Sequence, residues 1–448
     1  MEKFSKLYLS EDFVEQLLSR LPPKSLMRFK CVCILWCNLI KGPNFVAKHL
    51  SNSMGASSMP VLFKRPVFIG KNKKIIDEKE ECLNDDDNVE TRLSSLDLYD
   101  ENDVDDVLLS IVVEDLNLPL PASLKLKHSS DLRIAGHCDG IICLKLFIGN
   151  VILWNPVMKE FKLLPKSCRL LPNDDYELLE YRLRSYSEHL GFGYDSNGKD
   201  YKVVRFVIYD KEGYWFGAEV YTMNSNSWRD IKTTYNEMTT HVLQSSDLSI
   251  YLNGICYWDV SGLHHLEYYE GFILSFNMVN ELFNEISFPN LRDGCRVATL
   301  AVWKEFIALF TYQDGIGIPQ SNDMWVMMDN PGDAKGSWTK HLTIGPVECD
   351  GFPLLFCNSN HLFMVNGGGQ IVVYDTGARI LKYLPIHFMG DVIYNQALAY
   401  ENSIVSIKGG NVLDGIYISA FYGSGKFQSS YRGKVDISAF QGIGRSEL

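Results

Sequence analysis

The sequence predicts an α+β protein in which three short N-terminal helices precede a large all-β domain. Three observations support this fold class. Residues 9–40 carry apolar side chains at helical spacing. From about residue 130 to 410, short β-type runs alternate with Gly, Asn and Asp, and aromatic residues recur along them. With 448 residues and 46% apolar composition, the chain can bury a substantial core.

The first predicted helix begins after Ser10, whose hydroxyl can cap it by accepting a backbone N–H. Phe13, Leu17 and Leu21 recur at a spacing of four residues and line one face. Pro22-Pro23 is expected to end this helix, because proline lacks an amide donor and disfavours helical geometry in the residue before it.

Two further helices are predicted over residues 24–32 and 35–40, and the last of them carries Trp36. Such short helices have more apolar surface than they can cover among themselves. The segment therefore needs a partner, either another protein or the domain that follows it. The second case would make it an ordinary helical cap on that domain.

This pattern resembles the F-box, the adaptor-binding helical motif of cullin–RING ubiquitin ligases. The matching positions are Leu9, Asp12, Leu17, Leu21-Pro22, Lys24-Ser25-Leu26, Arg28-Phe29-Lys30, Val32-Cys33, Trp36 and Leu39-Ile40. Ser10 stands where the family usually has proline, and Ile34 where lysine is common. The resemblance implies an adaptor-binding set of Leu9, Leu17, Leu21, Pro22, Ser25, Leu26, Phe29, Val32, Cys33 and Trp36.

Acidic residues are concentrated between residues 77 and 106. That segment holds fourteen acidic side chains against Lys79 and Arg92, and its net charge of −12 equals that of the whole chain. Nucleic-acid binding needs clustered lysine and arginine, so no nucleic-acid partner is expected. The segment is interpreted as a flexible, solvated insertion or as an attractor for a basic protein. The residues assigned to partner electrostatics are Asp85, Asp86, Asp87, Asp103, Asp105 and Asp106.

Aromatic residues mark a repeat in the β-type region. Each copy has an apolar strand that ends in an aromatic residue, a polar turn, and a strand with a second aromatic residue. The first aromatics are Trp154, Tyr221, Phe276, Trp325 and Tyr374, with partners Phe161, Trp228, Phe283, Trp338 and Tyr383. Their spacings of 67, 55, 49 and 49 residues favour a kelch-like β-propeller, with six blades expected. A β-sandwich is the alternative architecture.

This region is similar to the plant F-box-associated domain. The matching strings are Phe63-Lys64-Arg65, Cys138-Asp139-Gly140, Trp154-Asn155-Pro156, Gly191-Phe192-Gly193-Tyr194-Asp195, Tyr201-Lys202-Val203-Val204, Ser227-Trp228-Arg229 and Trp325-Val326-Met327-Met328. The acidic run after the first string is similar to the S-locus F-box type of self-incompatible flowering plants. That type implies a pollen-side receptor that selects basic pistil ribonucleases for ubiquitination.

The two resemblances divide the chain into five parts. Residues 8–50 are expected to form the F-box, residues 51–76 a connecting segment with a first strand, and residues 77–106 the acidic insertion. Residues 107–410 are assigned to the F-box-associated β domain, and residues 411–448 to a C-terminal extension without an assigned role.

Candidate catalytic and metal sites fail on geometry or spacing. Neighbours in an extended run point to opposite faces, so His137-Cys138-Asp139 cannot form a catalytic relay. Cys31, Cys33 and Cys37 lack a second ligand pair at zinc spacing and are interpreted as small buried thiols. We therefore expect no catalytic residue, no metal and no cofactor.

The predicted function is that of a non-catalytic substrate receptor. By resemblance, the F-box binds a Skp-type adaptor and through it a cullin–RING ligase, while the β domain binds a target, expected to be a basic ribonuclease, for degradation. Two alternatives remain open: a scaffold that recruits partners without degradation, and an enzyme acting on a small molecule in a propeller channel.

The sequence predicts a cytoplasmic protein, with the nucleus as the alternative. No run approaches the roughly 20 apolar residues that span a bilayer, and the N-terminus lacks the regions of a secretory signal. The 11 cysteines show no repeating framework, which is typical of a reducing compartment. No membrane partner is expected.

Overall fold

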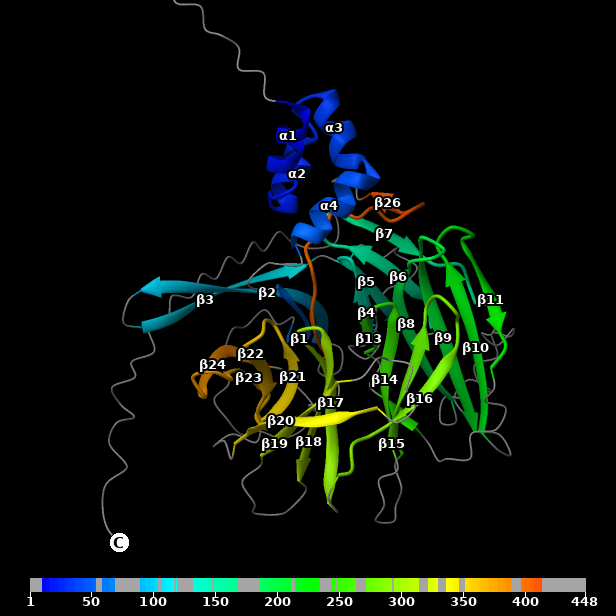
Figure 1. Cartoon of the computed structure of the whole chain (residues 1–448), viewed down its shortest axis with the longest axis vertical. Helices are drawn as coiled ribbons and strands as arrows, with labels where there is room; N and C mark the ends of the chain where they lie inside the picture. Colours follow the sequence, from blue (N-terminus) through cyan, green and yellow to red (C-terminus); the bar gives the residue numbers. More distant parts are fainter. Residues whose placement is uncertain are drawn as a thin grey trace, which may run out of the picture.

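The fold is described from a computed structural model of the chain (Figure 1). The structure describes residues 10–53, 59–68, 89–103, 106–116, 118, 132–146, 149–167, 186–210, 214–233, 243–245, 248–262, 271–291, 294–313, 321–328, 336–345, 351–387 and 396–412. These residues form four helices at one end of the molecule and six β-sheets arranged around a ring.

The helical domain contains α1 (Glu11–Leu18), α2 (Pro23–Phe29), α3 (Ile34–Lys41) and α4 (Pro43–Ser53). The first three lie where the sequence predicts helices, and α4 was not predicted. Ser10 caps α1 by accepting a hydrogen bond from the Phe13 amide, as expected. The role of the proline pair differs from the prediction: α1 already ends at Leu18, and Pro23 is the first residue of α2, where its missing N–H costs nothing.

The β domain is a six-bladed propeller, which confirms the predicted architecture over the β-sandwich. Blade 1 contains β1 (Val61–Phe68), β2 (Val89–Asp103), β3 (Asp106–Leu116) and β25 (Ala397–Ala399). Blade 2 contains β4 (Leu132–Cys138), β5 (Ile141–Leu146), β6 (Val151–Asn155), β7 (Glu160–Leu163) and β26 (Asn411–Val412). Blade 3 contains β8 (Tyr186–Asp195), β9 (Asp200–Asp210), β10 (Tyr214–Thr222) and β11 (Ser227–Ile231).

The remaining three blades follow in chain order. Blade 4 contains β12 (Leu243–Ser245), β13 (Ile250–Leu252), β14 (Ile255–Gly262), β15 (Gly271–Asn277) and β16 (Phe283–Ser287). Blade 5 contains β17 (Cys295–Trp303), β18 (Phe306–Gln313), β19 (Asn322–Met327) and β20 (Trp338–Ile344). Blade 6 contains β21 (Phe352–Phe356), β22 (His361–Val365), β23 (Gln370–Asp375) and β24 (Ile380–His387).

Blade 1 closes the ring by joining strands from the two ends of the propeller. β25 pairs antiparallel with β1, so that Val61 lies opposite Ala399. The first strands of neighbouring blades lie side by side, for example β4 with β8 and β17 with β21. Each blade can then cover its apolar faces against its neighbours, which a single blade cannot do alone.

The five predicted anchor aromatics occupy the third strand of successive blades, and each packs toward the preceding blade. Four of them are buried: Trp154, Tyr221, Phe276 and Tyr374. Trp325 is only partly buried, beside a register shift between Met324 and Trp325. The repeat detected in the sequence is therefore the repeat of the blades.

The predicted second aromatics lie opposite their anchors in three blades. The pairs are Trp154 with Phe161, Tyr221 with Trp228, and Phe276 with Phe283. In blade 6, Leu381 rather than Tyr383 lies opposite Tyr374, and in blade 5, Lys340 rather than Trp338 lies opposite Trp325. In these two copies the second aromatics, Trp338 and Tyr383, still lie on the strand that follows the anchor strand, β20 and β24, but at a shifted position.

A turn residue follows the anchor directly in several blades. The side-chain oxygens of Asn155, Asn277 and Asp375 each accept hydrogen bonds from two backbone N–H groups of the turn that follows. Two predicted hairpin turns are also present: Asn253-Gly254 joins β13 to β14 with positive φ at both residues, and the turn before β23 has Gly369 at positive φ.

The domain boundaries differ from the prediction at three places. The propeller begins at Val61 rather than at residue 107, because β1 and β2 are strands of blade 1. Residues 89–103, expected to be a flexible insertion, form β2, paired with both β1 and β3. Residues 411–412, assigned to the C-terminal extension, pair with β7. Residues 77–88 and 413–448 lie outside the described residues.

Candidate functional site

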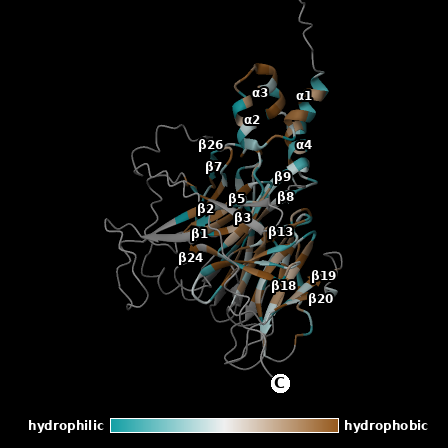
Figure 2. Ribbon diagram, turned by 90° about the vertical axis from the view of Figure 1, so that its left-hand side faces the viewer, coloured by the Kyte–Doolittle hydropathy of each residue, from teal (hydrophilic) through white to brown (hydrophobic). Residues whose placement is uncertain are grey.

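The helical domain exposes a set of large apolar side chains that the propeller does not cover. We call Phe13, Leu17, Val32, Ile34 and Leu35 the exposed apolar set. Their exposed fractions run from 47% for Phe13 to 79% for Ile34. They come from α1, from the turn before α3 and from the start of α3. Figure 2 shows hydrophobic colouring along α3 at the end of the molecule away from the sheets. Exposed apolar surface of this kind marks a protein-interaction site.

The residues expected to bind the adaptor fall into three groups. Leu17, Pro22, Val32 and Cys33 are exposed. Leu21, Ser25, Phe29 and Trp36 are partly buried, and Trp36 packs edge-on against Phe29 with ring centroids 5.6 Å apart. Leu26 is fully buried and Leu9 lies outside the described residues.

Leu26 corrects the predicted adaptor-binding set. Its side chain is 0% exposed and belongs to the core of the helical domain together with Leu18, Ile40 and Phe45. A side chain without accessible surface cannot contact a partner, so Leu26 supports the domain from inside. Helical periodicity identifies an apolar position but does not say which of two apolar faces is covered.

Three exposed residues were absent from the predicted set: Phe13, Ile34 and Leu35. The sequence carried a signal for Phe13, because it lies four residues before Leu17 on the same face of α1. For Ile34 the signal was the departure from the lysine that is common at this position. The thiols next to this surface also differ from the prediction, because Cys31 and Cys33 are exposed rather than buried, and Cys33 Sγ caps α3 by accepting from the Trp36 amide.

The inner side of the helical domain rests on the propeller. Ile40 and Phe45 share one buried cluster with Met158, in the turn between β6 and β7, and with Ile404, which follows β25. Within the domain, Lys48 of α4 forms a 2.9 Å ion pair with Glu15 of α1. One side of the helices is therefore covered by the propeller, and the exposed apolar set remains uncovered.

A strap formed by residues 400–412 lies between the two domains. Ile404 packs into the helical core, while Val405 and Ile407 pack into the core between blades 2 and 3. Apolar residues of one extended segment therefore pack alternately into the helical domain and into the propeller. The strap was not recognised in the sequence.

Two buried side chains of blade 2 hold the strap. Asn155 donates to the carbonyl oxygens of Ser403 (3.3 Å) and Val405 (2.8 Å). A Glu160 carboxylate oxygen accepts from the Ser406 hydroxyl (2.8 Å) and the Ile407 amide (2.7 Å). In the string Trp154-Asn155-Pro156, the tryptophan thus packs between blades, and the asparagine forms a turn and fixes the strap.

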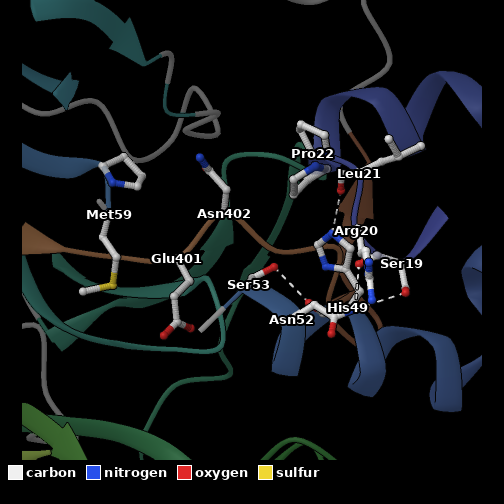
Figure 3. A pocket seen from close by; sticks show the side chains of 12 residues that line it. Ser19, Arg20, Leu21, Pro22, His49, Asn52, Ser53, Met59, Glu401 and Asn402 are labelled. Carbon is white, nitrogen blue, oxygen red and sulfur yellow. Dashed lines mark hydrogen bonds between the residues drawn. The ribbon is translucent and has the colours of Figure 1, made fainter. Parts of the chain in front are cut away.

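A cavity of about 280 Å³ lies between the helical domain and the propeller (Figure 3). His49 and Asn52 of α4 lie on one side of it, and Met59 and Glu401 on the other. The polar side chains of α4 hydrogen-bond to the residues that follow α1. Asn52 donates to Ser19, and the His49 ring nitrogen Nε2 lies 3.0 Å from the Leu21 carbonyl oxygen. These contacts join helices to one another rather than pointing to a ligand.

At the centre of the ring, the inner edge of β4 is covered. Gln396 both accepts from the Ile134 amide and donates to the Ile134 carbonyl, at 2.8 and 3.0 Å. Ser249, which precedes β13, donates to the Ala135 carbonyl through its amide and its hydroxyl. Residues next to strands of blades 1 and 4 therefore hydrogen-bond to this strand of blade 2.

The triplet His137-Cys138-Asp139 has the electrostatics of packed residues. Burial lowers the pKa of His137 to about 4 and raises the pKa of the Cys138 thiol. Asp139 accepts a 2.7 Å hydrogen bond from the Tyr201 hydroxyl. A nucleophilic cysteine needs a lowered pKa, so this arrangement opposes thiolate chemistry. Within the described ranges, no group of three or more His, Cys, Asp or Glu side chains is arranged to hold a metal.

Few of the residues assigned to partner electrostatics can be placed. Asp103 and Asp106 lie opposite each other at the end of the β2–β3 pair. Asp85, Asp86, Asp87 and Asp105 lie outside the described residues. Among the described helices, none is long and apolar enough to cross a membrane.

Comparison with known proteins identifies both domains. A family model of the F-box domain matches residues 7–48, and the model of the F-box associated beta propeller domain matches residues 91–406, more than half of the chain. An F-box/kelch-repeat protein of Arabidopsis thaliana is 27% identical over 354 residues, which cover 77% of this chain and 81% of that protein. A putative F-box protein of the same plant is 25% identical over 288 residues, covering 64% of this chain and 62% of that protein.

These matches confirm the resemblance to plant F-box proteins on both domains, whereas the S-locus type stays a prediction. The four-helix domain with its exposed apolar set corresponds to the F-box match, and the six blades correspond to the propeller match. The chain belongs to the plant F-box proteins that carry an F-box associated β-propeller domain.

Proposed function

We propose that this protein is the substrate-recognition subunit of a Skp–cullin–F-box ubiquitin ligase. The observation that carries the proposal is the exposed apolar set on a domain whose other side is already packed on a propeller. In this role the F-box binds a Skp-type adaptor, and the propeller binds a protein target.

The exposed apolar set is the part of the F-box that we assign to the adaptor. Large apolar side chains at an interface centre commonly contribute more than about 2 kcal/mol each when they fill a partner's pocket. Leu17 and Val32 belong to both the predicted set and the exposed apolar set. Trp36 and Phe29 support this surface from inside the domain, because their edge-on contact orients the start of α3.

The packing between the domains supports a role in which the chain promotes ubiquitination without catalysing it. The strap and the cluster around Phe45 fix the F-box on blade 2, so the adaptor and the target are held by one continuous body. Holding a target lysine near a ubiquitin thioester raises its effective concentration. The chain then acts by positioning alone.

The target we propose is a basic protein, with a secreted ribonuclease of the S-locus type as the specific candidate. Support comes from the sequence resemblance and from the concentration of acidic charge between residues 77 and 106. Opposite charge speeds encounter more than it increases affinity, because exposed ion pairs contribute only about 0–1 kcal/mol each. In this proposal loops of the β domain select among ribonucleases. The site of action is the cytoplasm, with the nucleus as the alternative.

Co-purification of the full chain from plant tissue, followed by mass spectrometry with and without proteasome inhibition, tests the function. The proposal expects the adaptor, a cullin, and a target that accumulates when degradation is blocked. Recovery of the adaptor with neither a cullin nor a target that accumulates would favour the non-degradative scaffold. Recovery of neither would contradict the receptor function.

A matched pair of variants makes the experiment specific. One double variant, Ile34→Ala with Leu35→Ala, removes exposed apolar side chains of the F-box. The other, Leu282→Ala with Met328→Ala, removes apolar side chains of the propeller that are also more than half exposed. Only the first pair should lose the adaptor and the cullin. Loss in both would point to general instability instead.

A further inference from the structure

The outer face of α3 changes from apolar to basic toward the propeller. Ile34, Asn38 and Lys41 recur at helical spacing, and all three are exposed. Because an α-helix rises about 1.5 Å per residue, Lys41 lies roughly 10 Å beyond Ile34 along the helix axis. One face of α3 therefore carries part of the exposed apolar set at its start and a cation at its end.

Three lysines from other elements extend the basic end of this face. They are Lys30, directly after α2, Lys159, in the turn between β6 and β7, and Lys408, in the strap. Lys30 interacts electrostatically with Lys41 and with Glu160, the residue after Lys159. Figure 1 shows β7 and β26 next to the helical domain. We call Lys30, Lys41, Lys159 and Lys408 the basic strip.

Two carboxylates beside the basic strip already serve the fold. Glu160 is buried and accepts hydrogen bonds from two groups of the strap, which bring Lys408 next to β7. Asp200 interacts with Lys162 of β7, is buried, and accepts a 2.9 Å hydrogen bond from the Asn224 amide. The exposed members of the basic strip are Lys41, Lys159 and Lys408. The cations therefore face solvent, and these two anions face the interior.

The lysines of the basic strip also repel one another. Burial lowers the pKa of Lys30, Glu160 raises it, and the charge of Lys41 lowers it further. Repulsion between the cations at the ends of α2 and α3 is thus present in the folded protein. An anionic group of a partner placed beside them would relieve this repulsion.

We infer that the adaptor interface continues from the exposed apolar set onto the basic strip, where an acidic segment of the adaptor pairs with the lysines. The continuous outer face of α3 supports the adaptor as the occupant, because a partner bound at Ile34 and lying along this helix reaches Lys41. This inference rests on the proposed receptor function and names the chemistry of a second adaptor contact. The apolar side chains supply affinity, while the lysines speed association and fix the direction in which the adaptor lies.

A nucleic acid fits the basic strip less well than an acidic protein segment does. The whole chain has a net charge of −12, which repels a long polyanion. A short acidic segment that is already held by apolar contacts beside the basic strip meets the lysines without bringing further negative charge to the rest of the molecule.

Titration of the full-length protein with a purified Skp-type adaptor, at about 50 and about 500 mM salt, tests the inference. The basic-strip variant carries Lys41→Glu, Lys159→Glu and Lys408→Glu, and the matched variant carries Lys166→Glu, Lys232→Glu and Lys304→Glu at exposed positions elsewhere on the propeller. At low salt the basic-strip variant should bind about tenfold or more weakly, and the matched variant within about twofold of wild type. At high salt the difference should shrink to less than about threefold, because exposed charges are screened.

Cross-linking with a water-soluble carbodiimide identifies the paired groups. The reagent joins a carboxylate to a lysine amine where the two are in contact, and mass spectrometry locates the new amide bond. The wild-type complex should give cross-links from the basic strip to aspartate or glutamate residues of the adaptor. Lys166, Lys232 and Lys304 should give none.

Circular dichroism shows whether each variant remains folded. Lys41→Gln with Lys159→Gln is the milder variant, should lose about threefold in affinity at low salt, and replaces the triple variant if that one unfolds.

Equal affinities of the basic-strip and matched variants at low salt would overturn the inference. A loss that does not depend on salt, or a wild-type complex without cross-links from the basic strip, would overturn it as well. In these cases the adaptor still binds, so the receptor function stands. If the wild-type protein does not bind the adaptor at all, both the receptor function and the inference fail.

Discussion

In the propeller, Tyr221 and Phe276 are completely buried between neighbouring blades, whereas in the F-box Ile34 and Leu35 are 79% and 72% exposed. Both regions are built from short elements with apolar faces. The difference lies in closure, because every blade has a neighbour on each side and the F-box has the propeller on one side only. A region that cannot close on itself keeps a surface for another protein.

The largest effect is expected from an anchor of the closed region. Phe276→Ala should destabilise the protein by about 3–5 kcal/mol, because it leaves a cavity in the core between blades 3 and 4. Urea unfolding followed by circular dichroism measures the change. Leu282→Ala, at a half-exposed position of the same blade, is the control and should stay close to wild type. Similar losses of unfolding free energy in both variants would contradict the claim that the buried anchors stabilise the propeller more than exposed apolar residues do.

A smaller effect is expected where the two regions meet. Asn155→Ala leaves the buried carbonyl groups of Ser403 and Val405 without this donor and removes the turn contacts to Val157 and Met158. The expected loss is about 1–3 kcal/mol, and hydrogen exchange should increase in the strap. Ser225→Ala, in an exposed turn, serves as the control. Unchanged exchange in residues 400–412 would show that the strap is held by other contacts.

A pH effect is expected on the F-box side of the molecule. Burial lowers the pKa of His49, although its contact with the Leu21 carbonyl partly opposes this. A folded-state pKa below the unfolded value of about 6.5 means that the stabilisation is complete above that pH and is lost as the pH falls through it. Hydrogen exchange in α1 and α4, corrected for intrinsic rates, should therefore rise between pH 7.5 and 5.5.

The substitution His49→Gln tests this assignment. Glutamine can still donate to the Leu21 carbonyl but does not titrate. The rise in exchange should shrink in this variant. An identical rise in both proteins would assign the pH response to other groups.

The smallest stability effect is expected for the exposed apolar set. Ile34→Ala should change the free energy of unfolding by no more than about 0.5 kcal/mol, because its side chain makes few buried contacts. Leu26→Ala, eight residues earlier, should cost about 2–5 kcal/mol. Thermal unfolding of both variants measures the contrast, and equal losses would place Ile34 in the core.

The sequence predicted the propeller because the anchor aromatics repeat with the blades, but it did not show blade 1. That blade has no repeat copy, since its strands come from residues 61–116 and 397–399 and meet only when the ring closes. The strap was missed for a similar reason: Asn155 and Val405 are far apart in sequence, and no local pattern links them.

For the F-box, helical spacing located the apolar residues but not their exposure. Leu26 and Leu17 carry the same side chain at helical positions, and one is fully buried while the other is 49% exposed. The distinction depends on α4 and on Met158 of the propeller, which cover one side of the domain. It could not be predicted from residues 9–40 alone.

The most direct test of the account is calorimetric titration of the purified protein with a Skp-type adaptor. The variants are a triple substitution in the F-box, Phe13→Ala, Ile34→Ala and Leu35→Ala, and a matched triple in the propeller, Leu282→Ala, Met328→Ala and Ile380→Ala. The account predicts that the F-box variant loses more than about 2 kcal/mol of binding free energy while its circular dichroism is unchanged, and that the propeller variant binds as wild type does. Full-strength binding by the folded F-box variant would contradict the claim that the uncovered side of the helices is the adaptor surface.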